Sequence, residues 1–175
     1  MPTSGTGTVR RFSNGFTLLE LVIVLVIIGI SLGYVGPRLF TGFSSSNLDK
    51  ASRDIMAVIQ FARSTALTQH KTHYLHFDID QSWVGVYPLP ETSGIVPEMI
   101  IQRELPKGVS ITGIKSPYQN EKEQGSMDLK VTPEGIVEQG VIYLEGSFGK
   151  IYTLMIKPFS GAVRVYDRLV GVTYG

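Results

Sequence analysis

The feature that most constrains this chain is an apolar run near its N-terminus. From Phe16 to Val35 there are 20 residues, and the only charged one among them is Glu20. A helix of that length spans about 30 Å, the thickness of the hydrocarbon core of a bilayer. Val and Ile are weak helix formers in water, but in lipid a helix is the only single segment that satisfies its own backbone. The run therefore predicts a transmembrane helix over residues 16–36.

Glu20 is out of place in such a segment. An acidic side chain costs roughly 2.5–3.5 kcal/mol at the bilayer centre and less near the interface, so membrane-embedded acids usually have a partner. Glu20 lies four residues into the run. This position points to a role in assembly rather than in catalysis. The alternative is a charge that is tolerated near the membrane surface.

A removable secretory signal is an alternative interpretation of the same run, because Arg10 and Arg11 precede it. No alanine occurs before Ala51, so an A-x-A cleavage site is missing, although Ser31-Leu32-Gly33 leaves a small-x-small pattern. Ordinary signal cleavage therefore fits this N-terminus poorly.

The segment Gly15-Phe16-Thr17-Leu18-Leu19-Glu20, followed by unbroken apolar residues, resembles the N-terminal signal of type IV prepilins and type II secretion pseudopilins. In that family a membrane-embedded prepilin peptidase cleaves after the glycine and methylates the new N-terminal phenylalanine. The resemblance implies a leader peptide over residues 1–15, cleavage between Gly15 and Phe16, and N-methylation of Phe16. It also implies that Glu20 pairs with the Phe16 amine of a neighbouring subunit during assembly.

Two neighbouring positions bear on this resemblance. Pro37 corresponds to the proline at which many pilin helices are kinked, and it implies a helix bend there. The residue before the cleavage glycine is Asn14, where the family commonly has Lys or Arg.

Beyond Pro37 the chain predicts an α+β, pilin-like fold. Apolar residues recur at helical spacing in the predicted periplasmic half of the long helix, residues 37–69, at Leu48, Ala51, Ile55, Val58, Ile59, Ala62 and Ala66. From Thr72 onward, short runs rich in Val, Ile, Tyr and Phe predict antiparallel strands in a globular head over residues 70–175, at Thr72–Ile79, Trp83–Pro88, Met99–Glu104, Val109–Ile114, Met127–Val131, Val141–Leu144, Ile151–Lys157 and Ala162–Asp167. We expect the helix to pack on the concave face of a sheet and the polar segment Ser116–Ser126 to form an exposed loop or a mobile insertion.

The head also resembles the H-type minor pseudopilins and the related FimT-type minor pilins. Three stretches carry this similarity: QFARSTALTQHKTHYLHFD at the end of the helix, VTPEGIVEQGVIYLE with a Pro-x-Gly turn between strands, and PFSGAVRVYD as a closing hairpin.

The chain offers little that suggests an enzyme. His70, His73 and His76 lie within seven residues, but on a strand His73 and His76 point to opposite faces and cannot converge on one metal ion. Asp78 and Asp80 lie in DIDQS, which is ordinary turn chemistry. Cysteine is absent, and no phosphate-binding loop, nucleophile elbow or metalloprotease helix occurs. We expect no catalytic residue, no metal site and no cofactor.

A mildly basic C-terminal region makes Arg164 and Arg168 the candidates for DNA contact, because some FimT-type minor pilins serve DNA uptake. Asp167 lies between them, and a charged strand edge in solvent is the favoured interpretation of the pattern. The formal net charge is +1 for the whole chain and −1 without residues 1–15, which carry two of the 16 cations and none of the 15 acids. We therefore expect no nucleic-acid partner.

The resemblance as a whole implies a minor pseudopilin, a structural subunit of the pilus-like fibre of a type II secretion system. Its place would be the inner membrane, single-pass, with the C-terminal domain in the periplasm. The implied partners are the prepilin peptidase and methyltransferase, other pseudopilins or pilins, inner-membrane lipid and secreted substrate. The alternatives are a type IV pilus minor pilin acting in pilus assembly or DNA uptake, and a membrane-anchored periplasmic binding domain.

Overall fold

The computed structural model describes residues 17–90 and 98–171, and within them it leaves the side chains of residues 33–45 undescribed. The chain divides into two compact units, Met1–Leu39 and Phe40–Gly175.

The long helix α1 covers Leu18–Gln69, or 52 residues, close to the predicted helix. It begins directly after Thr17, whose carbonyl accepts a hydrogen bond from the Leu21 amide at 3.2 Å. The helix bend expected at Pro37 stays a prediction, because the side chain of Pro37 lies outside the described residues.

Among the residues that the structure describes, no helical stretch is both long enough and apolar enough to cross a membrane. The predicted transmembrane segment over residues 16–36 stays a prediction, because residue 16 and the side chains of residues 33–36 lie outside the described part of the chain.

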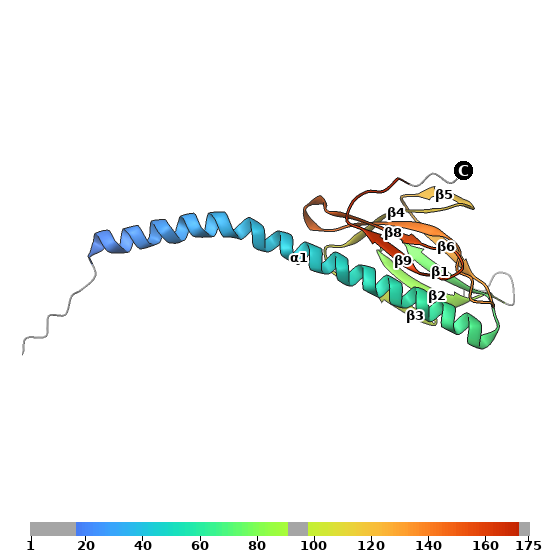
Figure 1. Ribbon diagram of the computed structural model, residues 1–175. Coiled ribbons are helices and arrows are strands. Elements are labelled where there is room, and N and C mark those ends of the chain that lie inside the picture. The colour runs from blue at the N-terminus through green and yellow to red at the C-terminus, as the bar shows by residue number, and fades with distance from the viewer. Residues whose placement is uncertain (1–16, 91–97, 172–175) are drawn as a thin grey trace, which may run out of the picture. The chain divides into compact units, whose positions relative to one another are not determined.

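The second unit contains two antiparallel sheets (Figure 1). The four-stranded sheet has the order β3-β2-β1-β6, and its strands are Ile101–Glu104, Trp83–Pro88, His73–Asp78 and Ser126–Val131. The five-stranded sheet has the order β5-β4-β7-β8-β9, and its strands are Gln119–Lys122, Ser110–Ser116, Gly140–Glu145, Ile151–Ile156 and Val163–Tyr166. A short 3-10 turn, η1, covers Ser147–Gly149 between β7 and β8.

The core of this unit lies between α1 and the strands. The α1 positions predicted from helical spacing are all at most 1% exposed, which confirms the prediction: Leu48, Ala51, Ile55, Val58, Ile59, Ala62 and Ala66. They form one cluster with inward residues of both sheets, such as Phe77 and Leu154. The Tyr152 hydroxyl on β8 also donates a hydrogen bond to Asp49 Oδ1 of α1 at 2.9 Å. Apolar burial thus holds the helix against the strands, and a polar contact supports it.

Two expectations about the strands were wrong. The strands belong to two sheets rather than one, because β1 pairs with β6 and β4 pairs with β7 across long stretches of sequence. The segment Ser116–Ser126 is also not simply a loop, since β5 lies within it and pairs with β4. Three of the four β5 residues are exposed, so the strand has no apolar alternation that sequence could reveal.

β5 and the segment just before β7 cover the outer edge of β6. The backbone carbonyl oxygens of Ser126, Asp128 and Lys130 point away from β1 and accept hydrogen bonds from Lys122 Nζ, Gln119 Nε2 and the Glu138 amide, each at 2.8 Å. The Lys130 amide donates to the Glu138 carboxylate at 3.0 Å. Three carbonyls and one amide of this edge are therefore satisfied within the chain.

Candidate functional site

The histidines do not form a metal centre. His73 faces the core with none of its surface exposed, and its Nδ1 lies 2.9 Å from the Lys71 carbonyl oxygen. His76 lies on the opposite face of β1, with Nδ1 2.7 Å from Asp128 Oδ1. The prediction that these two side chains point apart is confirmed, and no group of three or more metal-ligating side chains occurs in the part of the chain that the structure describes.

The two aspartates of the DIDQS stretch hold a turn. Asp78 Oδ1 accepts a hydrogen bond from the Gln81 amide at 2.7 Å, and Asp80 Oδ1 accepts one from the Gly125 amide at 3.1 Å. The first bond is the turn chemistry that the sequence predicts, whereas the second ties this turn to the loop before β6.

An aromatic cluster surrounds His76 on the outer face of the four-stranded sheet. The His76 ring lies 4.9 Å from the Trp83 ring and 6.2 Å from the Tyr87 ring, centroid to centroid, and Tyr74 stacks on Tyr87 at 5.4 Å. Burial raises the pKa of the Tyr87 phenol above its usual range, and the nearby Asp128 carboxylate adds to the rise. Cross-strand ring pairs of this kind stabilise a sheet, and the cluster has that role here.

The start of α1 gives Glu20 a local role. The Glu20 amide donates a hydrogen bond to Thr17 Oγ1 at 3.2 Å, so Thr17 caps the helix. Thr17-Leu18-Leu19-Glu20 has the Thr-x-x-Glu spacing of a capping box, of which the structure records the bond from the Glu20 amide to Thr17 Oγ1, and a carboxylate in the first turn is favoured by the helix dipole. The spacing of these four residues is a sequence signal for this role, in addition to the assembly role predicted for Glu20.

The first turns of α1 carry a run of exposed apolar side chains. Every large apolar side chain from Leu18 to Leu32 is 46–84% exposed. A continuous exposed apolar surface of this extent marks a site of contact with lipid or with another protein.

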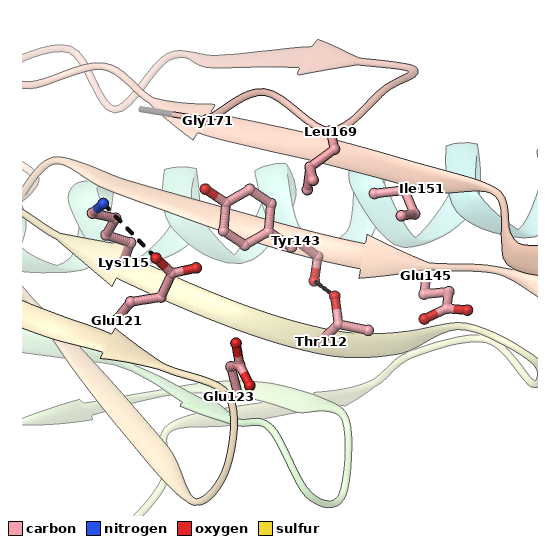
Figure 2. Close-up of a pocket in the computed structure, with 9 residues that line it drawn as sticks. All are labelled: Thr112, Lys115, Glu121, Glu123, Tyr143, Glu145, Ile151, Leu169 and Gly171. Atoms are coloured by element: carbon pink, nitrogen blue, oxygen red, sulfur yellow. Dashed lines mark hydrogen bonds and ion pairs between the residues drawn. The ribbon is translucent and has the colours of Figure 1, made fainter. Parts of the chain in front are cut away.

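The head contains an open groove of about 570 Å³ on the outer face of the five-stranded sheet (Figure 2). Its floor consists of Thr112, Tyr143 and Ile151. Glu121 and Glu123 lie on one side, and Leu169 reaches toward Tyr143 from the C-terminal segment on the other, as Figure 2 shows. The groove therefore combines apolar and acidic side chains from segments that are distant in sequence.

The C-terminal segment after β9 is fastened to the sheet by two side chains. Thr153, which is fully buried, donates a hydrogen bond from Oγ1 to the Arg168 carbonyl at 2.8 Å and accepts one from the Val170 amide at 3.1 Å. The Tyr143 hydroxyl donates to the Val170 carbonyl at 3.4 Å. These bonds make the segment a wall of the groove.

The groove is acidic. Glu121 pairs with Lys115 at 3.8 Å, whereas Glu123 and Glu145 form no ion pair with any residue that the structure describes. Burial raises the pKa of the Tyr143 phenol, and the Glu121 charge raises it further. The remaining negative charge favours a cationic ligand.

Comparison with known proteins gives a sequence match for the N-terminal segment and structural matches for the fold. Residues 10–35 match the family described as the prokaryotic N-terminal methylation motif. No curated protein sequence matches the chain.

Three solved structures share its architecture. The minor pseudopilin EpsH of the Vibrio cholerae type 2 secretion system is 10% identical with a TM-score of 0.54, and the match covers 68% of this chain and 94% of EpsH. Escherichia coli GspH is 12% identical at a TM-score of 0.53, with 70% and 89% covered. The type IV minor pilin FimU of Pseudomonas aeruginosa is 16% identical at a TM-score of 0.51, with 71% and 92% covered.

The chain has a pilin-like fold. The α+β class predicted from the sequence is confirmed, and so is the resemblance to N-methylated H-type pseudopilins, which rests on the motif at residues 10–35 and on the fold of the head.

The remaining predicted site residues of this pilin-like chain stay predictions. Gly15 and Phe16 lie outside the described residues. Arg164 lies exposed on β9, and Arg168 lies exposed in the C-terminal segment, so both side chains reach solvent.

Proposed function

We propose that this chain is a minor pseudopilin, a structural subunit of the pilus-like fibre of a type II secretion system. The observation that carries the proposal is the juxtaposition in one chain of an N-terminal methylation motif, a helix start with uncovered apolar side chains, and a pilin-like head. An uncovered apolar helix needs either lipid or other helices around it, and a fibre subunit meets both in turn.

In this proposal the chain is anchored in the inner membrane by residues 16–36, with its head in the periplasm. A prepilin peptidase removes residues 1–15 and methylates Phe16. The subunit then enters the fibre beside other pseudopilins, where its work is structural rather than enzymatic.

Cleavage creates an ammonium group at Phe16, close to the membrane surface. A carboxylate in low dielectric is stabilised by such a cation, and Glu20 of one subunit is proposed to pair with the Phe16 amine of the next. The capping bond of Thr17 uses the Glu20 backbone and leaves its carboxylate available for this pair.

The first experiment tests processing. The full chain is expressed with a prepilin peptidase, and the mature N-terminus is determined by mass spectrometry. We expect an N-methylated Phe16 for the wild type, unprocessed protein for Gly15→Leu, and normal processing for the control Gly7→Leu, which lies elsewhere in the leader. A mature product that begins at any other residue would overturn the proposal.

The second experiment tests Glu20 by neutralising it. Glu20→Gln should insert and be cleaved normally, because a neutral amide is cheaper in lipid than a carboxylate. Cross-linking to other pseudopilins and secretion of a reporter substrate should fall partially, since the charge-assisted contact is lost. Glu20→Asp keeps the charge and serves as the control. Wild-type assembly of Glu20→Gln at matched protein levels would refute the pairing.

A type IV pilus minor pilin is the second candidate, and the fold shared with FimU favours it. Deletion of the gene distinguishes the two systems: a secretion subunit is required for export of the reporter, and a pilus subunit for surface pili. A membrane-anchored binding domain would instead keep its uncleaved N-terminus.

A further inference from the structure

We propose that the groove on the outer face of the five-stranded sheet is a docking site for a lysine-bearing segment of a neighbouring subunit. This inference rests on the proposed function, because the neighbour is another pseudopilin of the same fibre. It assigns a partner surface to the head, in addition to the contacts of α1.

The floor of the groove suits an apolar side chain. Tyr143 and Ile151 lie on adjacent strands β7 and β8, and Leu169 overhangs them with 63% of its surface exposed. Leu169 points toward the floor and borders the open groove, so it forms one continuous apolar surface with Tyr143 and Ile151 (Figure 2). Covering Leu169 and the floor removes apolar surface from water and favours docking.

The negative charge of the groove favours a partner segment with a positive charge. Three glutamates line it, and Lys115 pairs with Glu121 at 3.8 Å. Glu123 and Glu145 form no ion pair within the described residues. A lysine that enters the groove gains a contact with one of these carboxylates, while a phosphate backbone is repelled.

A protein segment fits this combination better than a small cation. A bare metal ion would need several ligands together, and the described part of the chain contains no group of three or more metal-ligating side chains. It would also leave the apolar floor unused. A segment with an aliphatic side chain beside a lysine uses both halves of the groove.

The groove is formed before any partner arrives. Thr153 and Tyr143 hold the C-terminal wall through three hydrogen bonds, and the pairing of β5 with β4 holds the acidic wall. A preformed site loses little conformational freedom on binding, which favours specific docking.

The test uses the full-length chain in membranes of cells that express the complete fibre system. A water-soluble carbodiimide joins a carboxylate to an amine in direct contact, without a spacer. We expect mass spectrometry to identify an amide bond between Glu123 or Glu145 and a lysine of a different pseudopilin. A photoreactive amino acid in place of Leu169 should cross-link to the same segment of that neighbour.

Removing charges from the groove tests the inference, and removing charges elsewhere provides the control. The double variant E123Q/E145Q should reduce the photo-cross-link at position 169 by roughly fivefold, as expected for the loss of a partly exposed charge contact. The matched double variant E98Q/E104Q removes the same charge from exposed positions at the other sheet and should leave the cross-link unchanged. Equal cross-linking in both double variants, or carbodiimide products to this chain alone, would overturn the inference.

The same experiment distinguishes a failure of this inference from a failure of the proposed function. If only the inference is wrong, the chain is still processed at Gly15 and cross-links to pseudopilins through α1, but not through the groove. If the proposed function is wrong, the wild type is not cross-linked to a pseudopilin at any position, whether or not it is processed at Gly15.

Discussion

Removing the Thr153 hydroxyl should release the C-terminal segment from the sheet. Thr153→Val keeps the shape of the side chain and eliminates both of its hydrogen bonds, to the Arg168 carbonyl at 2.8 Å and from the Val170 amide at 3.1 Å. Each bond contributes about 0.5–1.5 kcal/mol net, so the upper limit is about 3 kcal/mol. Because Arg168 and Leu169 are exposed, the freed backbone groups regain water and the loss should be about 1–2 kcal/mol.

This loss is local, so amide hydrogen exchange is the appropriate measurement. A change of about 1–2 kcal/mol in the opening of the segment accelerates exchange of the Val170 amide by roughly 5–30-fold. The full chain in detergent is compared with the variant by mass spectrometry, with fragmentation to single residues. Protection on β8 should change much less.

Thr153→Ser is the control, because it keeps the hydroxyl and removes only a buried methyl group. It should lower overall stability slightly and leave the Val170 amide protected. The reasoning is refuted if Thr153→Val exchanges at the wild-type rate at Val170, or if both variants accelerate it equally.

Two further predictions concern stability of the head. Gly161→Ala and Gly149→Ala both place a side chain at positive φ, +64° and +71°, but only at Gly161 would the new Cβ lie 2.9 Å from Val137 Cγ2. Gly161→Ala should therefore cost about 1–3 kcal/mol more in urea unfolding, and equal midpoints would contradict this. For Tyr87, whose pKa is raised in the folded state by burial and then by Asp128, the stabilisation is complete below the unfolded pKa near 10 and is lost as pH rises above it. Tyr87→Phe should show a smaller loss of stability between pH 9 and 11, and parallel pH profiles would show the account to be wrong.

Local patterns in the sequence predicted the helix and most strands because each depends on a few neighbouring residues. The helical spacing from Leu48 to Ala66 reports which face is buried, and the structure buries that face. The opposite orientations of His73 and His76 followed from the two-residue period of a strand. The prepilin-like motif is also local, so the order of its residues is enough to identify it.

Features that depend on pairing between distant segments were not predicted. β5 is short and polar, and only β4 makes it a strand. The division into two sheets depends on pairings such as that of His73 with Val131, which no local pattern encodes. The groove likewise draws its residues from Thr112 to Gly171, and they meet only after the five-stranded sheet has formed.

The occupied edge of β6 has a consequence for the proposed fibre subunit. If such subunits wait in a membrane, crowded and similarly oriented, an open strand edge would let their heads join by β-strand addition. Side chains from β5, Gln119 and Lys122, occupy two carbonyls that an added strand would need. In the proposed subunit they would hinder premature polymerisation along this edge and leave the order of the fibre to contacts made elsewhere on the subunit.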